Sequence, residues 1–217
     1  ELGILYTGVV NVPISTKIDE LSDLKFRLSH SGCRLVIASG IQTQKIRKIK
    51  NDLPDLEKVI VLDKMDLFES DEIYVEELLE NGKDFITNSS DVFYERWKSI
   101  NENDYANICY TSGTTADPKG IILTHRNYTA NVEQSSSLLN IPEWYVSLLI
   151  LPWDHAFAYT AGIYTLIKNG ASMAAVQLGK TSLETLKNVG KNIKEIRPTF
   201  LLSVPAIAKN FRKNIEK

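Results

Sequence analysis

Apolar residues recur along this chain at two spacings that alternate through its first hundred residues. Leu21, Leu24 and Leu28 share one face of a helical pattern, whereas residues 34–38 and 58–62 form short unbroken apolar runs typical of buried strands. In this part, strands are expected over residues 9–14, 34–38 and 58–62, and helices over residues 19–31, 42–50 and 71–81, the last closed by Gly82. Strand–helix alternation with short connections predicts a parallel sheet covered by helices.

The pattern resumes after a polar, less regular stretch over residues 83–104. Thr181 and Glu184 are spaced as a capping box at the start of one helix, and Pro198 ends that helix. In this part, strands are expected over residues 107–110, 121–123, 145–151, 171–176 and 199–204, and helices over residues 91–100, 125–139, 156–167, 181–197 and from 205 onward. The pattern predicts an α/β fold with two parallel-type sheets flanked by helices, in two lobes covering residues 1–100 and 101–217.

Composition and charge narrow the class of protein. Of the 217 residues, 43% are hydrophobic and 24% are charged, which is ordinary for a soluble globular protein, and the net charge of −2 gives no reason to expect nucleic acid. The longest apolar run, residues 146–153, is too short to span a bilayer. Cys33 and Cys109 lie far apart without metal-ligand spacing, which favours a reducing compartment, and we expect a cytoplasmic protein. Because the sequence starts at Glu1 and stops within a helical pattern, we expect it to be part of a longer chain.

Residues 110–120 contain the strongest candidate chemistry. They read Tyr-Thr-Ser-Gly-Thr-Thr-Ala-Asp-Pro-Lys-Gly and lie between two strand-like runs. Backbone N–H groups of a turn, adjacent hydroxyls and an ammonium group can converge on phosphate oxygens. The alternative is a Ser/Thr-rich connection whose hydroxyls bond their own backbone.

The order of these residues resembles the phosphate-binding signature of the AMP-forming adenylating enzymes, which include acyl-CoA synthetases, firefly luciferase and the adenylation domains of peptide synthetases. Only Ala116 departs from the family pattern, which has glycine there. Residues 151–157, Leu-Pro-Trp-Asp-His-Ala-Phe, are similar to a second signature, Leu-Pro-x-x-His, and residues 196–205 resemble the strand and helix that follow it. The resemblance implies a partial N-terminal domain, with the C-terminal domain and its catalytic lysine absent.

The resemblance also implies roles for individual residues. Six residues would hold the β- and γ-phosphates of ATP: Thr111, Ser112, Gly113, Thr114, Thr115 and Lys119. Thr111 would also lie near Mg²⁺. His155 would be catalytic, beside the acyl pocket and the α-phosphate, although a lone histidine at a strand end is more often structural.

Other residues near these segments have weaker interpretations. Asp154 would orient His155, and Trp153 and Phe157 would either line an acyl pocket or belong to the core. His125 is expected to have a structural or capping role, and His30 an exposed position without function.

The implied reaction uses ATP, Mg²⁺ and coenzyme A to convert a small-molecule carboxylic acid, for which we expect a fatty acid, into an acyl-CoA. Three alternatives stay open: an amino acid loaded onto a carrier protein, a non-catalytic nucleotide-binding relative to which Ala116 would point, and an α/β scaffold with a coincidental loop. We expect this chain alone to be inactive, without an integral membrane segment, open to peripheral membrane contact and prone to self-association through exposed apolar surface.

Overall fold

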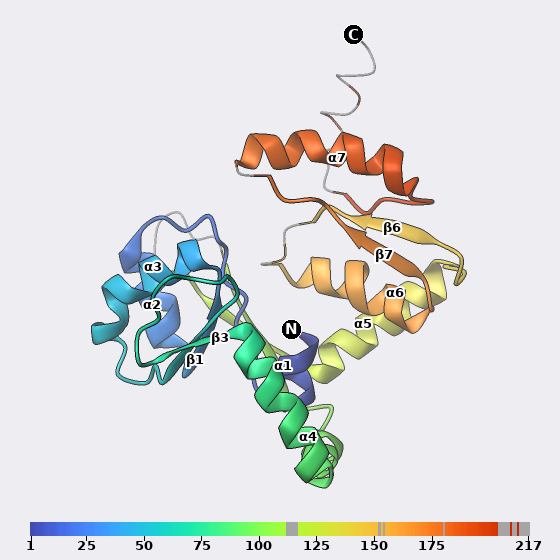
Figure 1. Cartoon of the computed structure of the whole chain (residues 1–217). Helices are drawn as coiled ribbons and strands as arrows, with labels where there is room; N and C mark the ends of the chain where they lie inside the picture. Colours follow the sequence, from blue (N-terminus) through green and yellow to red (C-terminus); the bar gives the residue numbers. More distant parts are fainter. Residues whose placement is uncertain are drawn as a thin grey trace. The chain divides into compact units, whose positions relative to one another are not determined.

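The computed structural model describes residues 1–111, 117–151, 153, 155–179, 181–203, 209 and 212, apart from the side chain of residue 182. The chain divides into two compact units, Glu1–Thr124 and His125–Lys217 (Figure 1). The strands on either side of residues 111–119, called the phosphate loop from here on after the role expected for it, therefore group with the first unit. The boundary at residue 100 between the two expected lobes stays a prediction.

The first unit combines a parallel sheet, a separate hairpin and the helices around them. Its elements are α1 (Leu2–Tyr6), α2 (Leu21–His30), β1 (Leu35–Ala38), α3 (Gly40–Ile49), η1 (Lys50–Asp52), β2 (Lys58–Val61), β3 (Glu72–Tyr74), α4 (Val75–Lys98), β4 (Tyr105–Tyr110) and β5 (Gly120–Thr124).

The sheet β1-β2-β3 is parallel throughout, as the alternation of strands and helices predicts. Helices α2 and α3 supply the apolar residues that cover one of its faces (Figure 1). The buried core of this layer contains Leu24, Leu28, Ile46, Ile49, Leu53, Val59 and Val61. On β1, Leu35 and Ile37 are 49% and 48% exposed, so the described residues leave part of the other face uncovered.

The helix expected over residues 71–81 is wrong at both ends. Residues Glu72–Tyr74 form strand β3, which pairs in parallel with β2, and pairing to a buried strand overrides a weak helix preference. The following helix, α4, does not end at Gly82 but extends to Lys98, with non-helical angles at Ser89 (φ −148°, ψ 36°). Helix α4 therefore also contains most of the helix expected over residues 91–100.

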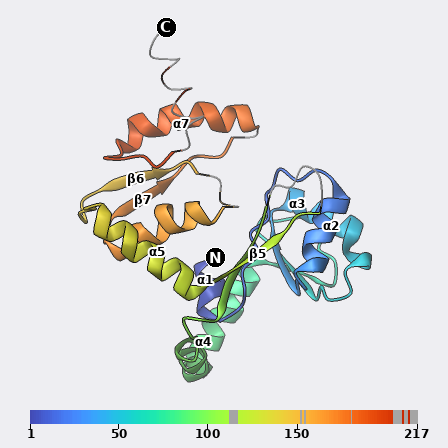
Figure 2. The same cartoon turned by 180° about the vertical axis from the view of Figure 1, so that it is seen from behind.

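Strands β4 and β5 form an antiparallel pair, unlike the other two sheets. Figure 2 shows β5 from behind. The strand expected over residues 9–14 is reduced to one parallel bridge between Asn11 and Asn107 of β4. Because β4 and β5 are antiparallel neighbours, the phosphate loop that joins them is the connection of a β-hairpin.

The second unit is a layered α/β arrangement. Its elements are α5 (His125–Leu138), β6 (Val146–Leu149), η2 (Ala158–Tyr164), α6 (Thr165–Lys168), β7 (Ser172–Ala175) and α7 (Ser182–Ile196). Strands β6 and β7 are parallel, with α7 on one face and α5 and α6 on the other (Figures 1 and 2). Of the strand expected over residues 199–204, the described residues 199–203 show a bridge between Phe200 and Ser147. Of the helix expected from residue 205, Lys209 and Arg212 are described, and both are helical.

Element η2 is a π-helix that runs directly into α6. The Thr165 hydroxyl donates to the carbonyl oxygen of Thr160, five residues earlier, at 2.7 Å. The wider turn brings Gly162 against β6, where an added Cβ would lie 3.3 Å from Leu149 Cδ2. Such π segments occur frequently at functional sites.

Among the described residues, no helix has both the length and the apolar character needed to cross a membrane.

Candidate active site

The phosphate loop connects β4 to β5, and its first and last residues, Thr111 and Lys119, are hydrogen-bonded to each other as a closed pair. Tyr110 pairs with Gly120 as the last pair of the β4–β5 ladder. Beyond it, the Thr111 N–H donates to the Lys119 carbonyl oxygen at 3.0 Å, and the Lys119 N–H donates to Thr111 Oγ1 at 3.2 Å. Both ends of the connection over residues 112–118 are thus fixed.

The side chains of Thr111 and Lys119 are exposed at the mouth of this loop. The ammonium group of Lys119 makes no ion pair with any residue that the structure describes. A hydroxyl and an uncommitted cation side by side suit an anionic ligand. Ser112, Gly113, Thr114 and Thr115, together with Ala116, lie outside the described residues.

Strand β4 is anchored directly before the loop by a buried phenol. Tyr110 is buried, and its hydroxyl donates to the Arg27 carbonyl oxygen at 3.2 Å and lies 2.9 Å from His30 Nδ1. Burial raises the pKa of the Tyr110 phenol, which keeps it protonated at neutral pH. The sequence analysis missed this contact, because it joins residues about eighty positions apart and no local pattern marks it.

His155 belongs to the second unit and comes directly before the helical segment that contains η2. Its carbonyl oxygen accepts from the Ala158 N–H at 3.0 Å, and its side chain is exposed. The imidazole makes no hydrogen bond to a described residue, and Asp154, expected to orient it, lies outside that set. His155 lies in the second unit, and the Thr111–Lys119 pair lies in the first.

The aromatic residues beside His155 are not part of the core. Trp153 and Phe157 are 42% and 55% exposed, whereas Tyr159, whose ring centroid lies 6.3 Å from that of Trp153, is buried. This excludes the core interpretation for both residues and leaves them available to a ligand. His125, as expected, stands at the first position of α5.

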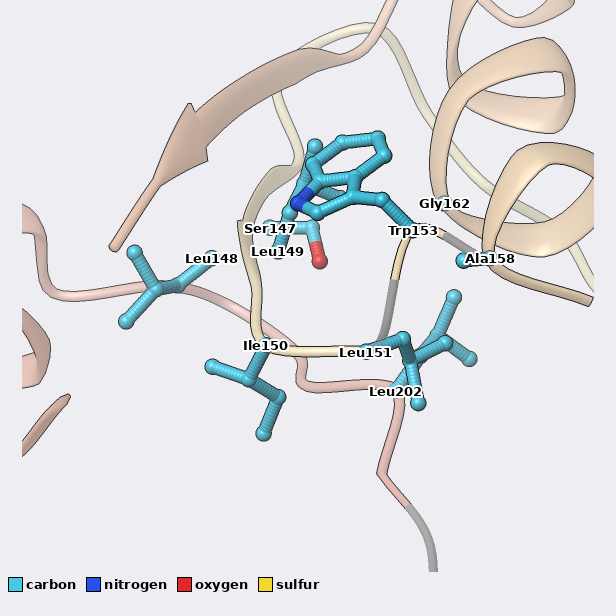
Figure 3. Close-up of a pocket in the computed structure, with 9 residues that line it drawn as sticks. All are labelled: Ser147, Leu148, Leu149, Ile150, Leu151, Trp153, Ala158, Gly162 and Leu202. Carbon is cyan, nitrogen blue, oxygen red and sulfur yellow. The ribbon is translucent and has the colours of Figure 1, made fainter. Parts of the chain in front are cut away.

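A narrow hollow lies between β6, η2 and the segment after α7 (Figure 3). Its lining is Ser147, Leu148, Leu149, Ile150, Leu151, Trp153, Ala158, Gly162 and Leu202. The Ser147 hydroxyl is fully buried there without a hydrogen-bond partner among the described residues. The accessible space is close to that of a single water molecule, so the hollow does not hold an acyl chain in this conformation.

Metal ligands are sparse in the described part of the chain, where no group of three or more His, Cys, Asp or Glu side chains could hold an ion. Mg²⁺ at a nucleotide site usually takes one or two protein oxygens and completes its shell with phosphates and waters. The exposed Thr111 hydroxyl fits that limited role.

Three comparisons with known proteins agree with this arrangement. The chain matches the AMP-binding enzyme family over residues 1–217. It is 28% identical over 199 residues to a long-chain-fatty-acid–CoA ligase of Mus musculus, a match that covers 88% of this chain and 26% of that protein.

Solved structures give the same fold. An anthranilate CoA ligase in complex with anthranoyl-AMP superimposes with a TM-score of 0.72 at 20% identity, covering 92% of this chain and 36% of that one. The inhibitor-bound N-terminal domain of FACL13 from Mycobacterium tuberculosis gives a TM-score of 0.69 at 25% identity, covering 97% and 47%. The chain thus spans about a quarter of the curated relative and under half of either solved chain. From the loop hairpin, the layered α/β units and the match along its entire length, the chain belongs to the AMP-binding enzyme family.

Proposed function

We propose that this chain is part of an AMP-forming acid–thiol ligase that activates a fatty acid as an acyl-adenylate and transfers the acyl group to coenzyme A. The observation that supports this most directly is the closed Thr111–Lys119 pair, which presents an exposed ammonium group at a loop with the family's phosphate signature. The choice of a fatty acid is supported by the relative from Mus musculus, whose name specifies long-chain fatty acids.

The chemistry requires two anions to meet. A carboxylate oxygen attacks the α-phosphorus of ATP, a new P–O bond forms, and the bond to the bridging oxygen breaks so that pyrophosphate leaves. A thiolate then attacks the acyl carbonyl carbon, and AMP leaves with the electron pair of the broken C–O bond. Positioned donors and cations stabilise the charge that develops on the leaving pyrophosphate.

Each proposed residue has a distinct task in the first step. The Lys119 ammonium binds the β- and γ-phosphates, and Ser112, Gly113, Thr114 and Thr115 donate to the same oxygens. Thr111 closes the loop and contributes an oxygen near Mg²⁺, which when bound neutralises phosphate charge. His155 contacts the reacting carboxylate or the α-phosphate, and Trp153 and Phe157 face the acyl group.

Lys119 provides the sharpest test of this assignment. In the full-length protein we expect Lys119→Ala to lower carboxylate-dependent exchange of labelled pyrophosphate into ATP by about 100-fold, the usual cost of losing one transition-state donor. Lys119→Arg retains the charge and is expected to lose less. Lys48→Ala, which removes an exposed lysine from α3, is the matched control and should exchange like the wild type.

Pyrophosphate exchange measured with a panel of fatty acids and amino acids distinguishes the alternative functions. Exchange with fatty acids supports the proposal, and exchange with amino acids alone would assign the protein to the carrier-loading branch. Measurable ATP binding without exchange for any acid would support a non-catalytic nucleotide-binding relative instead. Unchanged kinetics in Lys119→Ala would contradict the role given to the loop.

We further propose that the protein works in the reducing environment of the cytoplasm, where Cys33 and Cys109, which form no disulfide with any described residue, would stay reduced. Peripheral contact with membranes would be consistent with a fatty-acid substrate. Binding to vesicles of neutral and anionic lipid would test it.

A further inference from the structure

The buried phenol before the phosphate loop is held by the last turn of α2. The Tyr110 hydroxyl contacts the Arg27 carbonyl oxygen at 3.2 Å and His30 Nδ1 at 2.9 Å. The Arg27 guanidinium carbon lies 5.2 Å from the centre of the Tyr110 ring, and the His30 ring meets it edge-on with centroids 5.9 Å apart. The carbonyl oxygen and guanidinium group of Arg27 and the imidazole of His30, all in the last turn of α2, therefore contact the side chain of Tyr110.

The Tyr110 hydroxyl has one hydrogen and two partners on α2. The Arg27 carbonyl oxygen, at 3.2 Å, can only accept, whereas His30 Nδ1, at 2.9 Å, donates or accepts according to the tautomer of the imidazole. Both contacts are hydrogen bonds at the same time when His30 carries its hydrogen on Nδ1.

The turn that holds Tyr110 is itself fixed. Arg27 donates to both carboxylate oxygens of Asp23, at 2.8 and 3.3 Å, and is buried. The Ser31 hydroxyl donates to the same Arg27 carbonyl oxygen at 2.7 Å. The bidentate Arg27–Asp23 ion pair, together with the Arg27 carbonyl oxygen that accepts from both Ser31 and Tyr110, restricts the motion of the last turn of α2.

The constraint passes from Tyr110 to the loop through the hairpin ladder. Across from it, a Cβ on Gly120 would lie 3.4 Å from Tyr110 Cε1 and 3.0 Å from Ile108 Cγ2, so the ring lies close against the backbone of β5. The next pair is Thr111 and Lys119, joined by two hydrogen bonds. The last turn of α2 is thus linked to Lys119 through the side chain of Tyr110 and the adjacent Thr111–Lys119 pair.

We propose that Arg27 and His30 are positioning residues for the phosphate loop, which act by fixing the Tyr110 phenol and through it the Thr111–Lys119 pair. The proposal rests on the proposed function, because it assigns the loop to ATP. Neither residue touches the nucleotide. Their contribution is to hold the two ends of the loop in the geometry that binds the phosphates, so that binding does not have to order them.

The test uses the full-length enzyme and separates the apparent KM for ATP from the apparent KM for the carboxylate. Tyr110→Phe removes only the hydroxyl, and His30→Leu removes only the donor to it. His30→Leu is expected to raise the KM for ATP by about threefold to tenfold, the range for one lost hydrogen bond, with the KM for the acid unchanged. Tyr110→Phe, which loses both contacts of the hydroxyl, is expected to raise the KM for ATP at least as much. His30→Asn places an N–H near the position of Nδ1 and is expected to restore the wild-type value.

Two further variants make the result specific. The double variant Tyr110→Phe/His30→Leu should be no worse than Tyr110→Phe alone, because Tyr110→Phe already removes the bond to His30. Ser29→Ala changes an exposed residue on the same helix and should leave both KM values unchanged.

Three outcomes would contradict the proposal. The first is wild-type kinetics in Tyr110→Phe and His30→Leu while Lys119→Ala is impaired, which would remove the positioning role and keep the proposed function. The second is a parallel rise of both KM values with a lower melting temperature, which would indicate a structural role alone. The third is wild-type exchange in Lys119→Ala, which would remove the loop's assignment to ATP, and the positioning role with it.

Discussion

At the scale of a residue, the carboxylate of Glu72 is the most deeply buried charge partner among the described ion pairs. Its side chain is 1% exposed, and Arg47 donates to both of its oxygens, at 2.7 and 2.6 Å. The Glu69 N–H adds a third bond at 3.0 Å. These hydrogen bonds from Arg47 hold the pKa of Glu72 below its ordinary value of 4.5, against the opposing effect of burial.

This shift predicts a dependence of stability on pH. A carboxylate with a lowered pKa in the folded state stabilises the fold above its unfolded pKa, and the stabilisation is lost as the pH falls through the folded value. We therefore expect the opening free energy of β2 and β3 to be constant near neutral pH and to decrease below about pH 4.5. Glu72→Gln should cost about 2 kcal/mol or more at pH 7, because Arg47 loses its bidentate, most deeply buried partner and keeps only Glu69 and the Leu67 carbonyl oxygen, and should flatten the acid response.

Amide hydrogen exchange in the intact protein, corrected for its intrinsic pH dependence, measures this quantity for β2 and β3. Glu57→Gln is the control. Its pair with Arg34 is exposed and is expected to change stability by under about 1 kcal/mol. An equal effect of both substitutions would show that the burial of Glu72 contributes nothing.

At the scale of an element, α7 begins with a capping interaction that its sequence already indicates. The Thr181 hydroxyl accepts from the Glu184 N–H at 3.1 Å, which confirms the predicted N-terminus. The helix ends at Ile196, and the capping residue Arg197 has the left-handed backbone angles φ 51° and ψ 56° directly before Pro198. Both ends of α7 are therefore determined locally.

Thr181→Ala is expected to destabilise α7 by about 1 kcal/mol, the typical cost of removing a helix cap, and Thr181→Ser to retain most of the stability. Exchange of the first-turn amides of α7 in the intact protein checks this. Equal protection in the alanine and serine variants would mean that the hydroxyl does not cap the helix.

Local signals explain which elements the sequence predicts well. Patterns within a few consecutive residues are enough to predict the apolar face of α2 with Leu24 and Leu28, strand β2 with Val59 and Val61, and the helix cap at Thr181. Strand β3 is different, because Glu72-Ile73-Tyr74 has a polar start and becomes a strand only by pairing with β2 and by binding Arg47 from α3.

The candidate site divides in the same way. The loop and its lysine follow from consecutive residues, and so does the position of His155 directly before a helix. The partners of Tyr110 do not, since Arg27 and His30 reach it only after the chain has folded back from α2 to β4.

At the scale of the whole molecule, the proposed functional residues fall into two compact units. Thr111 and Lys119 belong to Glu1–Thr124, and His155 belongs to His125–Lys217. Each unit is therefore expected to respond to the ligand group that its own residues bind.

We expect pyrophosphate with Mg²⁺ to protect the amides of β4 and β5. A non-hydrolysable acyl-adenylate analogue, which lacks the β- and γ-phosphates, should instead protect those of residues 155–164. Amide hydrogen exchange of the full-length protein with each ligand measures both. Unchanged exchange of β4 and β5 with pyrophosphate would contradict the assignment of the loop, and unchanged exchange of residues 155–164 with the analogue would contradict the role of His155.

The uncovered apolar residues of β1 belong to the same scale. Parallel sheets are normally covered on both faces, and Leu35 and Ile37 are half exposed. This is the surface through which we propose that the isolated chain would self-associate.

The π-helical segment η2 has a consequence for how sequences of this kind can change length. A π turn closes i→i+5 hydrogen bonds and so holds about one residue more than an α turn. The loss of one residue within Ala158–Tyr164 would therefore convert the π segment to an α-helix while leaving the residues on either side nearly in register. His155 and Phe157 would keep their direction relative to α6, so this segment can lose a residue without redirecting the side chains that precede it.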